Sequence, residues 1–322
     1  MQIRPYHPSD LEPILELWLS SNLSAHPFVP ASYWTARRAF VGPALSQAEV
    51  WVYAEDDGAP LGFAGLTGEY LAGLFVADGA RSQGVGKALL DHLKTLHPRM
   101  ALHVYQKNHR AVHFYQREGF RFQAAEVEDA TGEPEYLLFW EAGTPPLFIR
   151  CGLPGDLIQV WAVAQQAVQG YGVSSQQGNG FRLTRSQCRD AVRRGELWCA
   201  ATPEGQVLGA ICVGRALMAT HREMVQRLPE PVMTICWLAV DPVAQRQGVA
   251  GSLLLHVISM AQAAGVPSVR AVVAQSDFKM RHLVGKLGFL QRSRHSLQNC
   301  PPSQLIFELP LAVNPFPEDA IF

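Results

Sequence analysis

The sequence predicts an α/β (α+β) protein that contains two tandem copies of one unit. Short apolar runs rich in β-branched and aromatic residues alternate with amphipathic helical segments along both halves. The order of these segments in the first half returns in the second. A glycine-rich stretch stands at the same point of each copy, RSQGVGKALLDHL at 81–93 and QRQGVAGSLLLHV at 245–257. A repeat of this length indicates a duplicated domain and not one large core.

Length and composition limit the class of protein. The chain has 322 residues, 48% of them hydrophobic and 17% charged, which indicates two globular domains of ordinary size. A formal net charge of −1 argues against a nucleic-acid or membrane partner. The first ten residues lack the apolar core of a signal peptide, and no apolar run has the length of a membrane span. We therefore expect a cytoplasmic monomer or homodimer, and because the six cysteines form no CxxC pair, we expect no metal site.

The domain boundary is predicted at EAGTPPL (141–147), a short stretch with paired prolines after the apolar run YLLFW. This gives a first domain over residues 1–142, a second over 147–312, and a tail over 313–322. Each copy begins with a short strand, a turn with Pro and Asp, and an amphipathic helix with a Trp. In the first copy Ser9 or Asp10 is expected to cap that helix. Extra segments at 170–180 and 215–231 occur in the second copy alone.

The remaining elements also occur in pairs. Two strands follow in each copy, joined by a turn at Asp57-Gly58 or at Glu204-Gly205. Then come a strand (AGLFV or TICWLAV), the glycine-rich stretch, a helix, a strand (MALHVY or VRAVVA), and a helix that ends in EGF or LGF. In the first copy the acidic segment EVEDATGEPEY (126–136) is expected to be a hairpin tip, which either steers a cationic amine or is an ordinary solvated loop.

Each glycine-rich stretch opens a helix, and this predicts an anion site. The first N–H groups of a helix have no intrahelical partner and lie at the positive end of its dipole, so they suit a phosphate or pyrophosphate. Gly84 and Gly86 lack a Cβ and would let such a ligand approach the backbone. The stretch is not a Walker loop, because no Gly-Lys-Ser/Thr follows at the right spacing. It is not a GxGxxG fingerprint either, because Leu89 replaces the third glycine.

These stretches, RSQGVG and QRQGVA, resemble the Arg/Gln-x-x-Gly-x-Gly/Ala signature of the GNAT superfamily of acetyl-CoA-dependent N-acetyltransferases. With LELWLSSNLSAHPFVPASYW and VYQKNHRAVHFYQREGF, the first half is similar to the small bacterial protein-lysine N-acetyltransferases of that superfamily. The resemblance implies two GNAT folds, each with a mixed, mostly antiparallel sheet splayed between strands four and five and flanked by helices. Acetyl-CoA would lie in the opening.

The resemblance also implies which residues bind the cofactor. In both copies they belong to strand four and the glycine-rich loop. In the first copy they are Leu74, Phe75, Val76, Arg81, Ser82, Gln83, Gly84, Val85, Gly86, Lys87 and, on a later helix, Asn108. In the second copy they are Leu238, Ala239, Val240, Gln245, Arg246, Gln247, Gly248, Val249, Ala250, Gly251 and Ser252.

The segment NHRAVHFYQREGF (108–120) carries the candidate catalytic acid. Asn108, Ala111 and Tyr115 are spaced three and four apart, so they fall near one helix face. The resemblance implies that Tyr115 points at the acetyl-CoA sulfur, where a phenol can give a proton to the departing thiolate. Asn108 would bind pantetheine or phosphate oxygens through its amide.

The acceptor amine must lose a proton before it attacks. Glu69, near the start of strand four, is the leading candidate for the general base, and Tyr70 and His26 are alternatives. His26, Phe28 and Tyr70 are expected to bind the acceptor, with His26 more a shaping residue than a base. The acceptor is expected to be a protein lysine or a small amine, such as a metabolite or an antibiotic.

The second copy lacks the acid. Aligning Gly119-Phe120 with Gly288-Phe289 places Val284 at the position of Tyr115, Asp277 at Asn108 and Met280 at Ala111. Three interpretations stay open. In the first, the second copy binds acyl-CoA or a partner without catalysis and regulates the first copy. In the second, it catalyses transfer with another general acid or with none. In the third, it has a structural role only. The possible substitute acids are Ser276, His282 and Tyr171.

Overall fold

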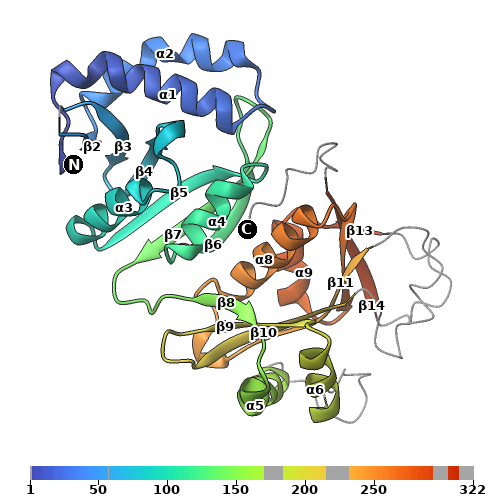
Figure 1. The fold of residues 1–322 in the computed structure, drawn as a ribbon. Coiled ribbons are helices and arrows are strands. Elements are labelled where there is room, and N and C mark those ends of the chain that lie inside the picture. Colours follow the sequence, from blue (N-terminus) through green and yellow to red (C-terminus); the bar gives the residue numbers. More distant parts are fainter. Residues whose placement is uncertain (1, 57, 170–183, 215–231, 293–303, 312–322) are drawn as a thin grey trace. The chain divides into compact units, whose positions relative to one another are not determined.

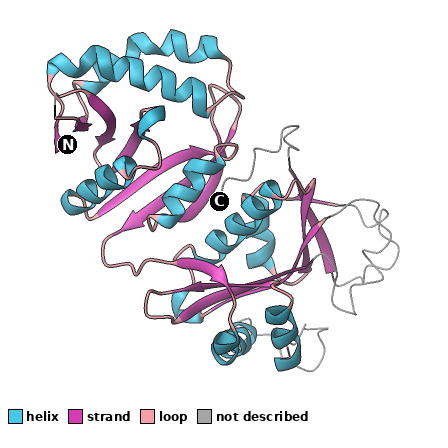
Figure 2. Ribbon diagram, in the orientation of Figure 1, coloured by secondary structure: helices cyan, strands magenta, loops and turns pink. Residues whose placement is uncertain are grey.

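The protein divides into two compact units, Met1–Thr144 and Pro145–Phe322 (Figure 1). The structure is a computed structural model, and it describes residues 2–56, 58–169, 184–214, 232–292 and 304–311. The division falls inside the predicted linker at 141–147. The predicted tail and the two extra segments of the second copy lie outside the described residues. Figure 2 shows that each unit combines a sheet with flanking helices.

The first unit holds a seven-stranded mixed sheet with the order β1-β2-β3-β4-β5-β7-β6. Its strands are β1 (Gln2–Pro5), β2 (Glu49–Ala54), β3 (Pro60–Thr67), β4 (Tyr70–Val76), β5 (Arg99–Tyr105), β6 (Arg121–Val127) and β7 (Pro134–Glu141). Its α-helices are α1 (Leu11–Ala25), α2 (Ala31–Leu45), α3 (Val85–Leu96) and α4 (His109–Arg117). Helices α1 and α2 pack against each other, and α1 also contacts β3 and β4 (Figure 1).

Local patterns explain these elements. Helix α3 buries Val85, Leu89 and Leu93 at a spacing of four residues, which places them on one face against the sheet. Strand β5 buries Met100, Leu102 and Val104, so alternate residues of the strand face the core. A second layer of core lies under α1 and α2. It contains Ile14, Leu15, Trp18, Trp34, Val50, Val52 and Phe63.

The sheet of the first unit opens between β4 and β5, as the resemblance implied. Strand β4 pairs with β3 along its length, from Tyr70 with Thr67 to Val76 with Gly62. Its parallel pairing with β5 is limited to Tyr70 with Ala101. The residues of β4 after Tyr70 therefore turn one backbone edge toward an opening, which is the splayed sheet predicted for both copies.

The second unit repeats the design with the order β13-β14-β12-β11-β10-β9-β8. Its strands are β8 (Phe148–Cys151), β9 (Leu197–Ala201), β10 (Val207–Gly214), β11 (Met233–Val240), β12 (Ser268–Ala274), β13 (Leu290–Gln291) and β14 (Gln304–Pro310). Its α-helices are α5 (Leu157–Gln169), α6 (Arg185–Arg193), α8 (Val249–Ala263) and α9 (Phe278–Lys286). Here β11 and β12 pair over Met233–Ile235 and then separate. The fold class predicted from the sequence is confirmed in both units.

The start of the first helix differs from the prediction in the same way in both copies. A short 3-10 helix (Pro8–Asp10) precedes α1, and Asp10 does not cap α1 but accepts a hydrogen bond from the His7 N–H at 2.8 Å. The Asp10 carboxylate also binds both terminal nitrogens of Arg4, at 2.6 and 2.9 Å. Asp156 and Arg150 repeat this bidentate pair at 2.6 and 2.9 Å. A capping rule for the α-helix alone misses such an arrangement, because the aspartate stabilises the turn before the helix.

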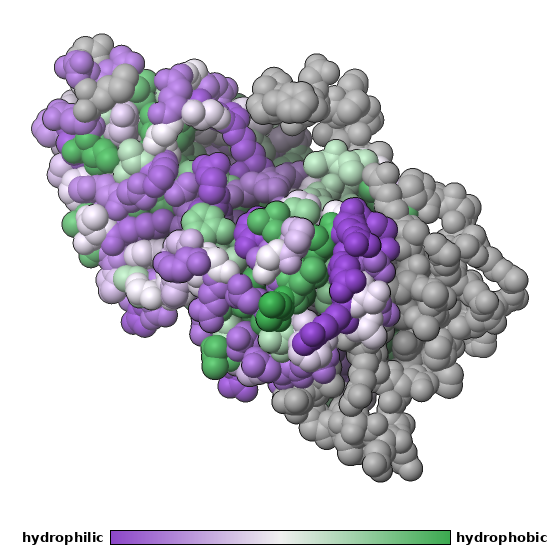
Figure 3. All heavy atoms as spheres, turned by 60° about the horizontal axis from the view of Figure 1, so that its bottom comes forward, coloured by the Kyte–Doolittle hydropathy of each residue, from purple (hydrophilic) through white to green (hydrophobic). Residues whose placement is uncertain are grey.

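The surface of the described residues is mixed. Hydrophilic side chains cover much of the face in Figure 3, with smaller hydrophobic groups among them. Among the described helices, none combines the length and the apolar character that crossing a membrane requires.

Candidate active site

The two glycine-rich loops have the same backbone conformation. Gly84 (φ 88°) and Gly248 (φ 76°) are the left-handed N-cap residues of α3 and α8. Two residues earlier, Ser82 (φ 62°) and Arg246 (φ 63°) are also left-handed, a conformation that residues with a Cβ rarely adopt. Because both copies keep this unfavourable conformation at the same position, the second loop retains the shape of the first.

Each loop presents backbone donors at a helix N-terminus. In α3 the first helical hydrogen bond runs from the Ala88 N–H to the Gly84 carbonyl, so the N–H groups of residues 84–87 have no partner within the helix. The space beside Gly84 is open, since an added Cβ would have no atom within 4 Å. The positive end of the helix dipole lies at the same point. This arrangement can bind a phosphate or pyrophosphate.

The second loop supplies one donor fewer than predicted. The Ser252 N–H bonds to the Gly248 carbonyl at 2.9 Å, and the residue is buried with 3% exposure. The available donors are therefore residues 248–251, and Ser252 presents none. Ser252 corresponds to Ala88 in the first copy, whose N–H is also used within the helix.

Several predicted contact side chains stabilise the loop itself. Gln83 Nε2 donates to the Gly79 carbonyl at 2.6 Å, and Gln247 Nε2 donates to the Val243 carbonyl at 3.0 Å. The Arg81 guanidinium pairs with Asp78 at 2.6 Å and donates to Ser24 Oγ at 3.1 Å. At these positions the side chains hold the loop in place.

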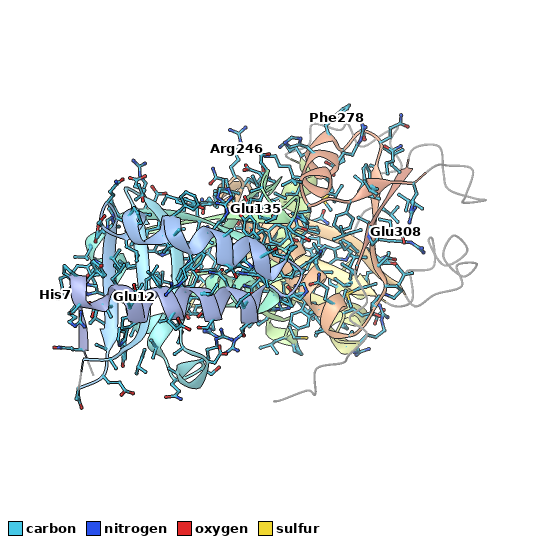
Figure 4. The ribbon with its side chains drawn as sticks, turned by 90° about the horizontal axis from the view of Figure 1, so that it is seen from above. His7, Glu12, Glu135, Arg246, Phe278 and Glu308 are labelled. Carbon is cyan, nitrogen blue, oxygen red and sulfur yellow. The ribbon has the colours of Figure 1, made fainter. Side chains whose placement is uncertain are left out.

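Other side chains near the loops are also engaged or exposed. Lys87 pairs with Asp91 at 2.5 Å. Ser82 Oγ accepts a hydrogen bond from Arg110 at 3.2 Å. By contrast, the exposed side chain of Arg246 stands clear of the ribbon in Figure 4.

Gly86 has a packing role. A Cβ there would be in ordinary contact with Leu74 at 3.4 Å and with Phe114 and Val76 at 3.5 Å. Ala250 occupies the same position in the second copy, which fits a site where a methyl group is tolerated. These ordinary contacts leave the role of Gly86 beside a ligand a prediction. Val85 and Val249, 4% and 1% exposed, pack beneath the loops and offer only their N–H groups.

Among the described residues, strand four of each unit has one backbone edge without a strand partner beside the loop; in the first unit Arg81 Nε donates to the Val76 carbonyl at 3.4 Å. Leu74, Phe75 and Val76 pair with β3 on one side, and the pairing of β4 with β5 ends before them. Their counterparts are Leu238, Ala239 and Val240, which pair with β10 and lie beyond the part of β11 that pairs with β12. A ligand with amide groups can bind such an edge as an added strand would.

Tyr115 lies on α4 among aromatic rings. It is 7% exposed and makes edge-to-face contacts with Phe114 and Phe120, with ring centroids 5.2 and 5.5 Å apart. Burial raises the pKa of its phenol well above the ordinary value, and the nearby phenol of Tyr70 raises it further. Tyr115 is therefore protonated at neutral pH, as a general acid must be.

Asn108 differs from its predicted place on the helix face, because it is the N-cap of α4. Its Oδ1 accepts a hydrogen bond from the Ala111 N–H at 3.1 Å, and its Nδ2 lies 3.0 Å from His26 Nε2. Both ends of the amide are thus occupied within the protein. The spacing rule placed Asn108 in the helix, but asparagine at the start of a helical segment is a common capping residue.

His26 is part of an aromatic cluster at the predicted acceptor side. Its ring contacts those of Phe28, Trp34 and Tyr105 at centroid distances of 5.7, 5.4 and 5.0 Å. Burial lowers the pKa of His26 to about 4, so the imidazole is neutral at pH 7. This environment supports the expectation that His26 and Phe28 shape the site.

The candidate bases Glu69 and Tyr70 have different partners in the structure. The Glu69 carboxylate is half-exposed and pairs with Arg99 Nε at 2.5 Å. Tyr70, 39% exposed, has its hydroxyl 3.1 Å from His103 Nδ1. Burial and the negative charge of Glu135 raise the pKa of Tyr70. Of the two, Tyr70 is the residue whose charge raises the pKa of Tyr115.

Sequence reasoning missed His103, although the acidic segment that it singled out contains the two glutamates beside it. His103 Nε2 lies 3.4 Å from Glu126 and 3.8 Å from Glu135, which Figure 4 labels. The three side chains place one ligand atom each within 4.8 Å of one another, a spacing that a cation could share. A signal for His103 existed, because it interrupts the apolar strand MALHVY. Its partners could not be found from the sequence, since strand register brings them together.

Glu128, in the predicted hairpin tip, is held by three hydroxyl groups. It accepts hydrogen bonds from Tyr33 at 2.9 Å, from Tyr105 at 2.5 Å and from Thr131. Lys107 pairs with Glu133 at 2.8 Å, so part of the acidic segment is neutralised. The hairpin tip is therefore fixed to α2 and β5, and this finding disfavours an ordinary solvated loop.

The second unit reproduces the backbone of the acid site without the acid. The Phe120 N–H bonds to the Tyr115 carbonyl at 2.9 Å, and the Phe289 N–H bonds to the Val284 carbonyl at 3.0 Å. Val284 is fully buried, so an apolar side chain fills this place. Asp277 caps α9 by accepting a hydrogen bond from the Met280 N–H at 2.9 Å, as Asn108 caps α4. Ser276 and His282 are exposed, and Tyr171 lies outside the described residues.

Comparison with known proteins gives a consistent result for both halves. Residues 46–122 match the family model described as Acetyltransferase (GNAT) domain, and residues 164–289 match the one described as Acetyltransferase (GNAT) family. The chain is 42% identical over 140 residues to the peptidyl-lysine N-acetyltransferase YiaC of Escherichia coli (strain K12), covering 43% of this chain and 95% of that protein. It is 33% identical over 138 residues to the peptidyl-lysine N-acetyltransferase YjaB of Salmonella typhimurium (strain LT2), again covering 43% of this chain and 95% of that protein. The solution structure of apo-form YjaB from Escherichia coli matches with 29% identity and a TM-score of 0.40, covering 43% of this chain and 96% of that one.

Proposed function

The chain belongs to the GNAT acetyltransferase family, and from this premise we propose that its first unit moves an acetyl group from acetyl-CoA to the amine of a protein lysine. The observation that carries the proposal is the place of Tyr115 on α4, buried among aromatic rings with a phenol that is protonated at neutral pH. The names of the two curated relatives support a lysine acceptor. A small metabolite or antibiotic amine is the alternative acceptor.

The residues of the first unit fit the donor. The N–H groups of residues 84–87 would bind the pyrophosphate, and the free edge of Leu74, Phe75 and Val76 would bind the amides of the pantetheine arm. Bound acetyl-CoA supplies the acetyl group in activated form, as a thioester. The open space at Gly84 leaves room for a ligand against the backbone.

Tyr115 would then act as the general acid. Its phenol stays protonated at neutral pH and gives its proton to the leaving sulfur, which makes the thiol a better leaving group. A backbone N–H from the free edge of β4 would stabilise the negative charge that develops on the acetyl oxygen. This division of roles needs no covalent bond to the protein, so the amine attacks directly in a ternary complex.

The acceptor side favours a cation. Glu126 and Glu135 lie on neighbouring strands near Tyr70, and their carboxylates attract an ammonium group. His26, Phe28 and Tyr105 form an apolar wall that suits the methylene chain of a lysine.

For the second unit we propose acyl-CoA binding without transfer. The matching conformations of Ser82 and Arg246, and of Gly84 and Gly248, support a preserved phosphate loop. The buried Val284 at the position of Tyr115 supports the loss of the acid.

The experiment uses the full-length protein, acetyl-CoA and a random peptide library with one central lysine. We expect release of coenzyme A and, by mass spectrometry, acetylation at the lysine Nζ. A parallel screen of small primary amines tests the alternative. Turnover of small amines alone would contradict the lysine assignment, and no release with either set would contradict the proposed activity.

A further inference from the structure

A series of polar side chains in the first unit begins at Tyr70 on β4 and continues over the neighbouring strands of the sheet. Tyr70 on β4 has its hydroxyl 3.1 Å from Nδ1 of His103 on β5. The two strands are parallel neighbours at Tyr70 and Ala101, so His103 is two residues beyond the last point where they pair. The contact therefore lies at the apex of the splayed sheet.

The other nitrogen of His103 faces two carboxylates. His103 Nε2 is buried and makes no hydrogen bond within the described residues, while Glu126 Oε2 is 3.4 Å and Glu135 Oε1 is 3.8 Å away. Glu126 and Glu135 are cross-strand partners of β6 and β7. The Glu126 side chain is 52% exposed, so this end of the series reaches solvent.

The first member of the series influences the proposed acid. Tyr70 lies at the apex of the splayed sheet, and the charge of its phenol raises the pKa of Tyr115. On the proposed path, the acceptor amine that attacks next to Tyr115 meets the Tyr70 hydroxyl. Glu69, the base expected from the sequence, is instead paired with Arg99 at an exposed position.

We propose that Tyr70, His103 and the pair of Glu126 and Glu135 form a proton path that takes a proton from the acceptor ammonium and delivers it to solvent. The path rests on the proposed lysine acetylation. Tyr70 touches the amine and is the catalytic residue. The other three act through it and are positioning residues.

Each turnover removes two protons from the acceptor ammonium. The ammonium gives one proton to Tyr70 Oη while the Tyr70 hydroxyl gives its own to His103 Nδ1. The resulting imidazolium carries protons on both nitrogens beside two carboxylates, and it loses the Nε2 proton through Glu126 to water. Proton exchange with water then moves the remaining ring proton from Nδ1 back to Nε2, which restores the resting tautomer. The neutral amine then forms the C–N bond as the C–S bond breaks. Its second proton replaces the one that Tyr115 gives to sulfur.

The second unit lacks the path, just as it lacks the acid. Thr234 stands at the position of Tyr70 on β11, and Val272 stands at the position of His103 on β12. Valine has no group that accepts or donates a proton, so the path is interrupted at this position. Acid and path therefore occur together in one unit, as a division between a catalytic and a non-catalytic copy requires.

Several ionisable groups face the path and contribute to its pH dependence. They come from five parts of the first unit: Tyr70 on β4, Tyr115 on α4, Glu126 on β6, Glu135 on β7 and Glu128 in the turn between β6 and β7. Glu126 and Glu135 lie within 4 Å of His103 Nε2, so two carboxylates face the side of the ring from which the proton leaves.

The test measures kcat and KM between pH 6 and 10 for the full-length protein, Tyr70→Phe and His103→Gln, with the lysine peptide library as acceptor. Both variants should lose kcat by about 100-fold near pH 7, with KM unchanged. The loss should shrink toward pH 10, because a free lysine amine loses its proton near pH 10.4 without help. The matched control is His97→Gln, which removes another histidine–glutamate pair, 3.0 Å from Glu49, and should leave the pH profile unchanged.

A second readout is independent of turnover. Nitrogen NMR of the His103 ring in the wild-type protein should show the proton of the neutral ring on Nε2, since the path requires Nδ1 to accept from Tyr70. A proton on Nδ1 would overturn the path. Variants that fold but keep the wild-type pH profile would also overturn it, while leaving the proposed acetyl transfer intact. A wild-type protein that releases no coenzyme A would overturn the proposed function and the path together.

Discussion

Gly62 on β3 determines how closely α3 approaches the sheet, and replacing it tests the geometry of the phosphate loop. An added Cβ would lie 2.9 Å from the Phe75 carbonyl oxygen, 2.9 Å from Val85 Cγ1 and 3.4 Å from Leu89 Cδ1. Carbon contacts are most favourable at about 3.5–4.0 Å, so Val85 must move by roughly 0.6 Å or more. Val85 is the first residue of α3, directly after the loop.

The expected cost follows from overpacking. A methyl group forced into a closely packed site costs about 1–3 kcal/mol. For a unit of this size, about 2 kcal/mol lowers the melting temperature of its transition by roughly 8 °C. The displaced first turn also carries the N–H donors, so we expect coenzyme A to bind the first unit about 10-fold more weakly, which corresponds to about 1.4 kcal/mol.

The assay compares Gly62→Ala with Gly65→Ala by calorimetric melting and by titration with coenzyme A. Gly65 is on the same strand, but its added Cβ meets only Val50 at 3.8 Å, an ordinary contact. Gly65→Ala should therefore change neither quantity by much. Equal behaviour of the two variants would refute the packing argument. Gly209→Ala is the counterpart in the second unit, because its Cβ would meet Val249 Cγ1 at 2.9 Å.

Three further predictions concern separate features. Asp10→Asn and Asp156→Asn each break one bidentate arginine pair, and each should destabilise its own unit by about 2 kcal/mol in a denaturant titration at pH 7; no loss in either would contradict the repeated role. For Glu128, burial raises the pKa but hydrogen bonds from three hydroxyls outweigh it, so the pKa is lowered. Its stabilising effect is present above about pH 4 and is lost as the pH falls through the lowered value, so wild type and Glu128→Gln should converge in stability in acid; a constant difference would refute this. Gly248→Val strains a left-handed position and should reduce the binding stoichiometry of coenzyme A from two to one without changing turnover; one site in the wild type would contradict acyl-CoA binding by the second unit.

Features encoded in local patterns could be predicted from the sequence. Alternating burial in β5 and the apolar face of α3 are visible as periods of two and near four residues. The duplicated glycine loops could be recognised because the same residue types recur before the same helix. The splay of the sheet came from the family resemblance, since nothing in the composition of β4 or β5 predicts where their pairing ends.

Features that depend on long-range contacts could not be predicted. The ion pair of Glu69 with Arg99 joins residues 30 positions apart, so the sequence left Glu69 as a candidate base. His103, Glu126 and Glu135 come from three strands and meet through register alone. Asn108 shows a local limit, because a helical spacing of three residues does not distinguish a cap from the first turn.

The central claim is that Tyr115 makes the first unit the catalytic one. Its most direct test is steady-state kinetics of full-length Tyr115→Phe with acetyl-CoA and a lysine peptide, together with titration of coenzyme A. We expect this variant to keep its affinity for coenzyme A and its KM, and to lose kcat by about 100-fold or more. A variant that turns over as fast as the wild type would contradict the claim.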